Sequence, residues 1–161
     1  MVFSLACAEE WLMDEPCIVS YSDIFYNNMA VCILMKNRER LAITYDPNWL
    51  ELWKKRFGNP LLDAETFCLN KNNFLVEIGQ KPKNVDDVEG QYMGLLRLTP
   101  AGWLEFVRIR SEQTAKEFDA MHMTGALQKI IDAGNINISA LAYTGEWGEI
   151  DSEKDLLCYQ K

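Results

Sequence analysis

The sequence has few of the residues on which several common kinds of site depend. It contains one histidine, His122, so a typical zinc site built from histidine ligands is excluded. We expect a structural or surface role for this residue, with a catalytic role as the alternative. The number of cysteines is odd and none form a C-x-x-C pair, which favours buried free thiols in a reducing compartment, the cytoplasm. The five are Cys7, Cys17, Cys32, Cys68 and Cys158.

Basic residues and long apolar segments are also scarce. The 16 Lys and Arg residues are outnumbered by 24 Asp and Glu, which gives a net charge of −8. A general nucleic-acid binder needs a basic face, so we expect no nucleic-acid partner. No segment reaches the roughly 20 apolar residues of a membrane-spanning helix. The first ten residues lack the basic start of a signal peptide, and Glu9 and Glu10 interrupt their apolar run, so we expect no membrane partner.

The order of apolar patterns and turn residues predicts a single α/β domain over 1–161. Strand and helix alternate in the first third of the chain, which is typical of a parallel sheet. A β-hairpin with an Asn-rich turn follows over 66–78. The predicted helices cover 2–14, 29–37, 47–57, 100–118, 124–133 and 152–159. The predicted strands cover 17–21, 41–45, 66–69, 74–78, 90–98 and 136–142.

Two acids stand at the ends of predicted elements. The apolar run over 17–19 predicts a buried parallel strand that carries Asp23 at its carboxyl end, where ligands bind in open α/β sheets. Asp151 comes just before the last predicted helix. Two carboxylates from distant parts of the chain suit Mg²⁺, which takes oxygen ligands. Alternatively, each acid caps backbone N–H groups of a loop or a helix.

Five stretches, taken together and in order, resemble a family of nucleotidyltransferases. The family includes bacterial phosphocholine and 2-aminoethylphosphonate cytidylyltransferases and, more distantly, sugar-phosphate nucleotidylyltransferases. The resemblance runs over essentially all 161 residues. The stretches are C-I-V-S-Y-S-D-I-F-Y, D-P-N-W-L-E-L-W with the later P-L-L-D-A-E-T, E-I-G-Q-K-P-K, G-Q-Y-M-G-L, and G-E-W-G-E-I-D-S-E-K-D-L.

The resemblance implies a fold and a reaction. The fold is a three-layer α/β domain with a Rossmann-like mixed sheet, similar to the nucleotide-diphospho-sugar transferases. The reaction is Mg²⁺-dependent transfer of a nucleoside monophosphate from a triphosphate, with CTP favoured, to a small phosphorylated or phosphonate acceptor such as phosphocholine. Pyrophosphate is released. A sugar-1-phosphate nucleotidylyltransferase is one alternative, and a non-catalytic remnant that binds a ligand or self-associates is another.

One part of the family pattern has no counterpart in this sequence. The family opens with a glycine-rich loop, G-x-G-x-R or similar, that holds the triphosphate, and nothing like it precedes Asp23. We therefore expect an N-terminally truncated form of the fold, with little transfer activity in this chain alone. The strand over 17–21 would then have an unpaired edge without charge or proline, which predicts a homodimer.

The resemblance also assigns roles to particular residues. Asp23 and Asp151 correspond to the two metal aspartates. Lys81 lies where sugar-nucleotide relatives carry the lysine of an E-K-P motif that contacts the acceptor's phosphate, although Gln80 replaces the glutamate here. A solvated loop lysine is the alternative. Gly94, with Gly90, would allow the backbone of the strand around Tyr92 to approach the acceptor closely.

An acceptor with an ammonium group needs aromatic faces and a carboxylate. We expect Tyr92 and Trp147 to supply the faces, because Trp147 lies close in sequence to Asp151. The candidate acids for the amine are Asp46 and Glu65. A further pair of tryptophans, Trp49 and Trp53, is spaced four apart on one helix face, which is more typical of core packing.

Overall fold

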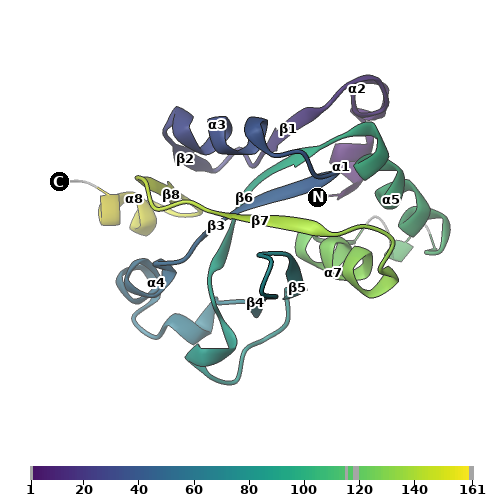
Figure 1. Cartoon of the computed structure of the whole chain (residues 1–161). Helices are drawn as coiled ribbons and strands as arrows, with labels where there is room; N and C mark the ends of the chain where they lie inside the picture. The colour runs from purple at the N-terminus through teal and green to yellow at the C-terminus, as the bar shows by residue number, and fades with distance from the viewer. Residues whose placement is uncertain (1, 115, 118–119, 160–161) are drawn as a thin grey trace.

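The computed structural model describes residues 2–114, 116–117 and 120–159. Its strands are β1 Cys17–Ser20, β2 Ile24–Tyr26, β3 Leu41–Asp46, β4 Phe67–Leu69, β5 Leu75–Ile78, β6 Gln91–Leu98, β7 Ile138–Ala142 and β8 Trp147–Glu149. Its helices are α1 Val2–Ala6, α2 Glu9–Asp14, α3 Asn28–Lys36, α4 Trp49–Phe57, α5 Pro100–Ser111, α7 Met123–Ala133 and α8 Glu153–Tyr159 (Figure 1).

A mixed four-stranded sheet with the order β1-β6-β3-β7 forms the centre of the fold. β6 runs antiparallel to both of its neighbours, β1 and β3, whereas β7 runs parallel to β3. β1, β3 and β7 therefore point in the same direction. The carboxyl ends of these three strands therefore lie at the same end of the sheet, and the loops that follow them gather there.

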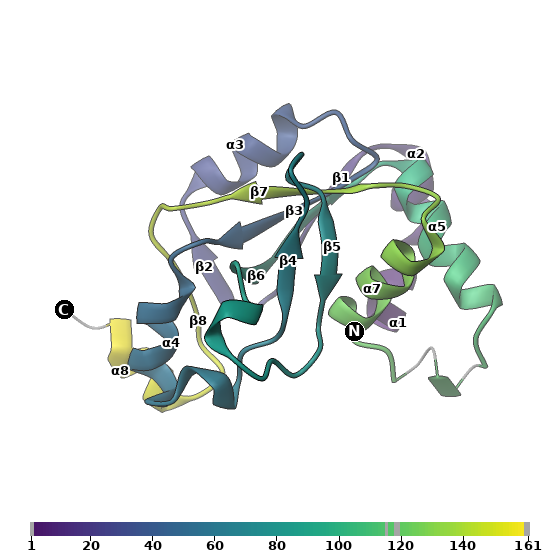
Figure 2. The ribbon, with the colours of Figure 1, turned by 60° about the horizontal axis from the view of Figure 1, so that its bottom comes forward.

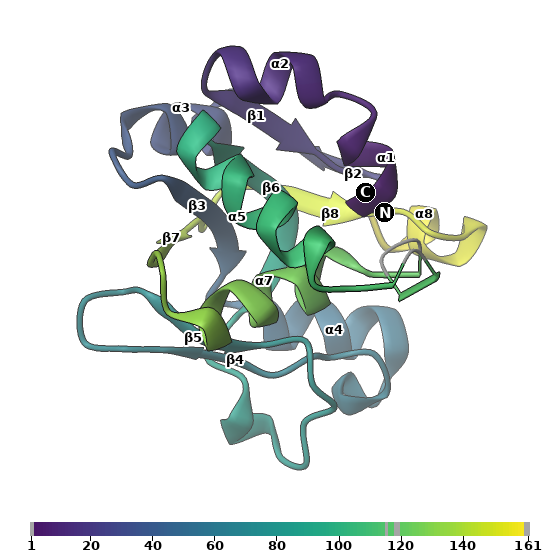
Figure 3. The same ribbon diagram turned by 90° about the vertical axis from the view of Figure 1, so that its right-hand side faces the viewer.

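Layers cover both faces of this sheet. α3 lies on one side, and α4 lies on the other together with the β4–β5 hairpin, as Figure 1 shows and Figure 2 shows from the hairpin side. α5 and α7 pack against each other along one side of the molecule (Figure 3). β3 is buried along its whole length, and Leu41, Ile43 and Leu96 are fully enclosed. The predicted α/β class with a mixed sheet is confirmed.

The strand before Asp23 differs from its prediction. β1 is an edge strand, half-buried and antiparallel to its neighbour, rather than a buried parallel strand. The eight-residue strand β6 takes the buried place between β1 and β3. A run of three apolar residues does not distinguish these two positions, since both give the same short pattern.

Several boundaries also differ from prediction. The helix predicted over 2–14 is divided into α1 and α2 by a turn at residues 7–8, and both Val2 and Leu12 are buried. α4 begins at Trp49, so Pro47 lies in the preceding turn instead of at the first helical position. α5 ends at Ser111, and part of its predicted extension to 118 lies outside the described residues. None of the helices in the described ranges is long and apolar enough to cross a bilayer.

Candidate active site

A short two-stranded ladder at the carboxyl end of the sheet joins two distant parts of the chain. β2 pairs antiparallel with β8, with Ile24 opposite Glu149 and Tyr26 opposite Trp147. The backbone N–H of Ile150 donates to the carbonyl oxygen of Asp23 at 2.9 Å. The ladder therefore places Asp23, which precedes β2, beside the acids at the end of β8.

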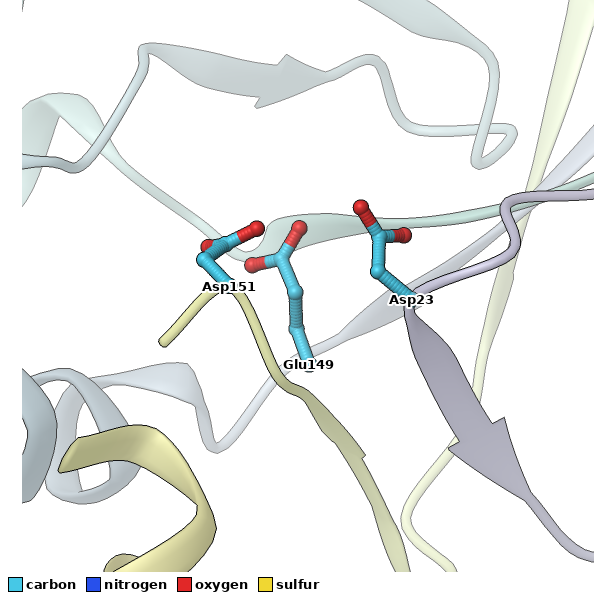
Figure 4. A group of neighbouring side chains, drawn as sticks. All are labelled: Asp23, Glu149 and Asp151. Atoms are coloured by element: carbon cyan, nitrogen blue, oxygen red, sulfur yellow. The ribbon is translucent and has the colours of Figure 1, made fainter. Parts of the chain in front are cut away.

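Three carboxylates meet at this ladder. One oxygen each from Asp23, Glu149 and Asp151 can be chosen so that all three atoms lie within 4.8 Å of one another. Figure 4 shows the three side chains in a row, with Glu149 between the two aspartates. Asp23 and Asp151 are exposed, whereas Glu149 is half-buried. A set of three hard oxygen donors, open to solvent on one side, fits the ligand preference of Mg²⁺.

A buried arginine supports this carboxylate cluster from behind. The Arg56 side chain has no exposed surface. Its Nη1 donates to Glu149 Oε2 at 2.8 Å and its Nη2 donates to Asp151 Oδ2 at 3.0 Å. Its Nε donates to Asp155 Oδ1 at 2.9 Å. One guanidinium therefore contacts two members of the cluster and a third acid on α8.

The pKa values of the acids around Arg56 shift in opposite directions. Burial raises the pKa of Glu149; the Arg56 hydrogen bond opposes this shift, and Asp151 adds to it. For Asp155, hydrogen bonds from Arg56 and Ser152 outweigh the effect of burial and lower the pKa. Arg56 is the single Lys or Arg that contacts Glu149, Asp151 and Asp155 in the described part of the chain. The cluster keeps excess negative charge, which a bound cation would offset.

Glu149 also lies in the wall of an open pocket of about 220 Å³. This pocket therefore adjoins the carboxylate cluster. The wall is rich in aromatic and acidic side chains. The aromatic ones are Tyr21, Trp53, Phe67 and Tyr92, and the acidic ones are Asp63, Glu65 and Glu149. A basic side chain, His122, also lines it. The pocket therefore has the chemistry of a site for a cationic group next to a site for a metal.

Glu65 is the acid most firmly built into this wall. The side chain of Gln91 donates to the Glu65 carbonyl oxygen at 2.7 Å, which fixes its backbone. The Thr124 hydroxyl donates to Glu65 Oε1 at 3.3 Å, and burial raises the pKa of the carboxyl. Among the described residues, no Lys or Arg forms an ion pair with Glu65. Among these residues, His122 acts on the Glu65 charge through space and without an ion pair, so the pocket can accept a cationic ligand beside this acid.

Two tyrosines form the side of the pocket nearest β1. The rings of Tyr21 and Tyr92 meet edge to face, with centroids 5.8 Å apart. The Tyr21 N–H donates to the Gly94 carbonyl at 2.9 Å. Gly94 has a φ of +78°, and a Cβ there would lie 2.6 Å from the Tyr21 ring. Gly94 is therefore required for the position of Tyr21, and burial raises the pKa values of both tyrosines.

Comparison with known proteins gives one close match in sequence and many in fold. The chain is 35% identical over 167 aligned positions to the CTP:phosphoglutamine cytidylyltransferase of Campylobacter jejuni, an alignment that covers 97% of this chain. This sequence match supports a cytidylyltransferase-like nucleotidyltransferase family for the chain. It spans 65% of the length of this curated relative. No family model matches the chain.

Solved structures of nucleotidyltransferases share the fold. The inositol-1-phosphate CTP transferase from T. maritima superposes with a TM-score of 0.69 at 16% identity, over 96% of this chain and 56% of that one. A protein from Bacillus anthracis described as a glucose-1-phosphate thymidylyltransferase, in complex with a sucrose, gives 0.69 at 13% identity, over 98% and 58%. The chain therefore has the Rossmann-like fold that its sequence implies.

The residues predicted from sequence occupy different places in this nucleotidyltransferase fold. Asp23 and Asp151 lie together at the cluster, and Tyr92 and Glu65 line the pocket. Gly94 supports the pocket wall through Tyr21.

Asp46 and Trp147 lie behind the wall and bond to each other. The Trp147 indole N–H donates to Asp46 Oδ2 at 2.9 Å, and the Asn48 N–H donates to Asp46 Oδ1 at 2.7 Å. Both side chains are buried, and Trp147 packs against Trp53, with ring centroids 6.2 Å apart. Neither lines the pocket, whereas Trp53, which is buried in the core as expected, also reaches the pocket wall. This geometry favours a structural role for the Asp46–Trp147 pair.

Lys81 also lies apart from the residues that line the pocket. Its Nζ donates to the carbonyl oxygens of Leu61 and Leu62, the latter at 2.7 Å. These carbonyls belong to the short 3₁₀ turn Pro60–Leu62. A lysine in this position closes the turn onto the loop after the hairpin. Contact between Lys81 and an acceptor phosphate stays a prediction.

The sequence interpretation missed Glu149, Arg56 and Tyr21. Glu149 stands two residues before Asp151, in a stretch that carries the family resemblance, and this closeness in sequence was a signal for it. Tyr21 stands two residues before Asp23, within a stretch that carries the family resemblance. Arg56 had no such signal, since its three partners are more than 90 residues away in the chain.

Proposed function

We propose that this chain carries the metal site and the acceptor site of a Mg²⁺-dependent cytidylyltransferase. The enzyme transfers CMP from CTP to a small phosphorylated acceptor with an ammonium group at its other end, and releases pyrophosphate. The observation that carries the proposal is the position of Glu149, which belongs both to the carboxylate cluster and to the wall of the acidic, aromatic pocket.

Asp23, Glu149 and Asp151 would hold the metal through carboxylate oxygens. When bound, Mg²⁺ supplies charge stabilisation to the phosphate oxygens of the reacting groups. The β2–β8 ladder keeps the three ligands together, since it fixes Asp23 beside the end of β8. Position and charge are the main contributions that a protein makes to phosphoryl-group transfer.

Charge sets the orientation of the acceptor in the pocket. The acids of the wall repel a phosphate, so the phosphate is favoured at the metal and the opposite end of the acceptor lies deeper in the pocket. Glu65 and the faces of Tyr21 and Tyr92 suit an ammonium group at that end. The acceptor in the relative's name, phosphoglutamine, and the phosphocholine expected from sequence both carry such a group.

A panel of acceptors tests this proposal. Because little transfer activity is expected of this chain alone, pyrophosphate release from CTP is measured with a version in which the family's glycine-rich segment precedes this sequence. The acceptors are phosphoglutamine, phosphocholine, 2-aminoethylphosphonate and glucose 1-phosphate. We expect turnover with at least one ammonium-bearing acceptor and none with glucose 1-phosphate. Preference for the sugar phosphate would support a sugar-1-phosphate enzyme. Metal binding without transfer to any acceptor would support a non-catalytic module.

Glu65→Gln separates the pocket from the metal site. Loss of the carboxylate should raise the KM for the acceptor about tenfold, equivalent to ~1.4 kcal/mol, and leave the KM for CTP nearly unchanged. Glu10→Gln, a change at an exposed position on α2, is the matched control and should alter neither constant. An unchanged acceptor KM in Glu65→Gln would remove Glu65 from the acceptor site.

A further inference from the structure

Arg56 is a buried cation whose contacts are unusual in number and in arrangement. It lies on α4, yet each of its three contacted carboxylates lies in the last stretch of the chain, on β8, on α8 or between them. Each of its three nitrogen atoms serves a different carboxylate, at 2.8 to 3.0 Å. A planar guanidinium holds its donors in a fixed fork, so these bonds set the relative positions of the acids.

The way Arg56 divides the carboxylate oxygens is specific. It bonds to Oε2 of Glu149 and to Oδ2 of Asp151. It takes one oxygen from each acid and leaves the other oxygen of each available to a cation. Two acids two residues apart would otherwise repel each other and turn apart in the absence of a metal.

The guanidinium itself is held on α4. Its carbon lies 5.4 Å from the centroid of the Trp53 ring and 4.9 Å from that of Phe57, two aromatic rings of the same helix. Trp53 in turn lines the pocket beside Glu149. Arg56 is therefore not a mobile surface side chain that happens to meet acids. Its side chain is held in place and determines where the contacted acids lie.

We infer that Arg56 is a positioning residue for the divalent cation. It holds Glu149 and Asp151 in the arrangement that binds the metal before the metal arrives. This inference rests on the proposed function, since it assumes that the carboxylate cluster binds a cation. If Arg56 acted only through its charge, removing that charge would strengthen cation binding, because a positive charge close to the site by itself weakens it.

Mn²⁺ titration followed by electron paramagnetic resonance separates these roles. Arg56→Lys keeps the charge but loses the fork, so we expect Mn²⁺ affinity to fall about tenfold or more, as for other residues that orient metal ligands. Asp155→Asn is the matched control, because it removes the negative charge that Arg56 contacts on α8 and leaves both contacted acids of the cluster unchanged. It should lower stability and leave Mn²⁺ affinity within about threefold of the parent.

The outcomes distinguish the two proposals. Parent-level Mn²⁺ affinity in a folded Arg56→Lys variant would overturn the role of Arg56 and leave the proposed function standing. A larger loss of affinity in Asp155→Asn than in Arg56→Lys would also overturn it, since Arg56 would then act as a tether of α8. Failure of the parent protein to bind Mn²⁺ would overturn the metal site and Arg56 with it.

A measurement on the unaltered protein covers the case in which Arg56→Lys does not fold. The Arg56 side-chain N–H resonances are followed by nitrogen-15 NMR during titration with Mg²⁺. We expect these protons to be protected from solvent exchange without Mg²⁺, and their shifts to saturate with metal binding. Rapid exchange in the metal-free protein would show that Arg56 does not hold the acids in advance, and would overturn the inference.

Discussion

At the scale of single residues, the buried Asp46 and the half-buried Glu65 differ in which groups bond to their carboxylate oxygens. Asp46 has a donor on each carboxylate oxygen, Trp147 on one and the Asn48 N–H on the other. Glu65 has one hydroxyl donor to its carboxylate and no ion pair among the described residues. A fully bonded acid is a structural feature, whereas a half-buried acid without a cation is a candidate for ligand binding.

Trp147→Phe tests the structural role of the Asp46 pair. The change removes the indole N–H and leaves Asp46 Oδ2 without its donor in a buried site, at a cost of about 1–3 kcal/mol in unfolding free energy. Chemical denaturation measures this loss. Mn²⁺ affinity and the acceptor KM should stay within about twofold of the parent values. A raised acceptor KM without a loss of stability would instead indicate that Trp147 belongs to the substrate site.

At the scale of elements, the β2–β8 ladder determines whether the cluster forms. Gly148 lies in the middle of β8, opposite Phe25. A Cβ there would lie 2.5 Å from the Tyr159 ring and 2.6 Å from the Phe25 ring. The Tyr159 hydroxyl also accepts a hydrogen bond from the Glu149 N–H at 3.2 Å. α8 and the β2–β8 ladder therefore pack closely against each other at Gly148, where there is no side chain to separate them.

Gly148→Ala should disturb the ladder and the cluster at once. Because the rings of Phe25 and Tyr159 must move apart, we expect a loss of about 1–3 kcal/mol in unfolding free energy and weaker Mn²⁺ binding through Glu149. Gly125→Ala on α7 is the matched control. Nothing lies within 4 Å of a Cβ there, so it should stabilise the helix by roughly 0.5–1 kcal/mol. Unchanged Mn²⁺ affinity in Gly148→Ala would separate the cluster from the ladder.

Local chemistry explains which elements could be predicted from sequence. Gly58 ends α4 with a φ of +74°, and Asn70 closes the hairpin turn by accepting from the N–H groups of Asn72 and Phe74. These are short-range effects. β8 was not predicted, since three residues that include a glycine give no strand pattern and their pairing depends on β2, more than 120 residues earlier.

The candidate site was predictable where sequence and fold class place residues at strand ends. Asp23 could be found in that way. Asp151 could be found from its place before the last helix together with the family resemblance, and Glu65 and Tyr92 from the ammonium-bearing acceptor that the resemblance implies. Trp53 lies in the core as expected, but its second place in the pocket wall could not be predicted, because the same spacing of tryptophans serves both. Arg56 could not, because its role arises only when α4 packs beside α8 and the end of β8.

At the scale of the whole molecule, the direction of the central strands gathers the site. The segments that follow β1, β3 and β7 all leave the sheet at its carboxyl end, and they supply Asp23, α4 with Arg56, and β8. β1 is bonded on one side only within the described part of the chain, and it has no charge or proline. The homodimer expected from this edge stays a prediction, which light scattering can test.

Divalent-cation binding by Asp23, Glu149 and Asp151 together is the proposal on which the others depend. Mn²⁺ titration of the 161-residue chain, followed by electron paramagnetic resonance, tests it most directly. The account predicts one saturable site from which Mg²⁺ displaces Mn²⁺. Asp23→Asn should weaken that site about tenfold or more, whereas Asp14→Asn, a change of an exposed acid on α2, should not. Absence of saturable binding, or equal affinity in Asp23→Asn and the parent chain, would contradict the account.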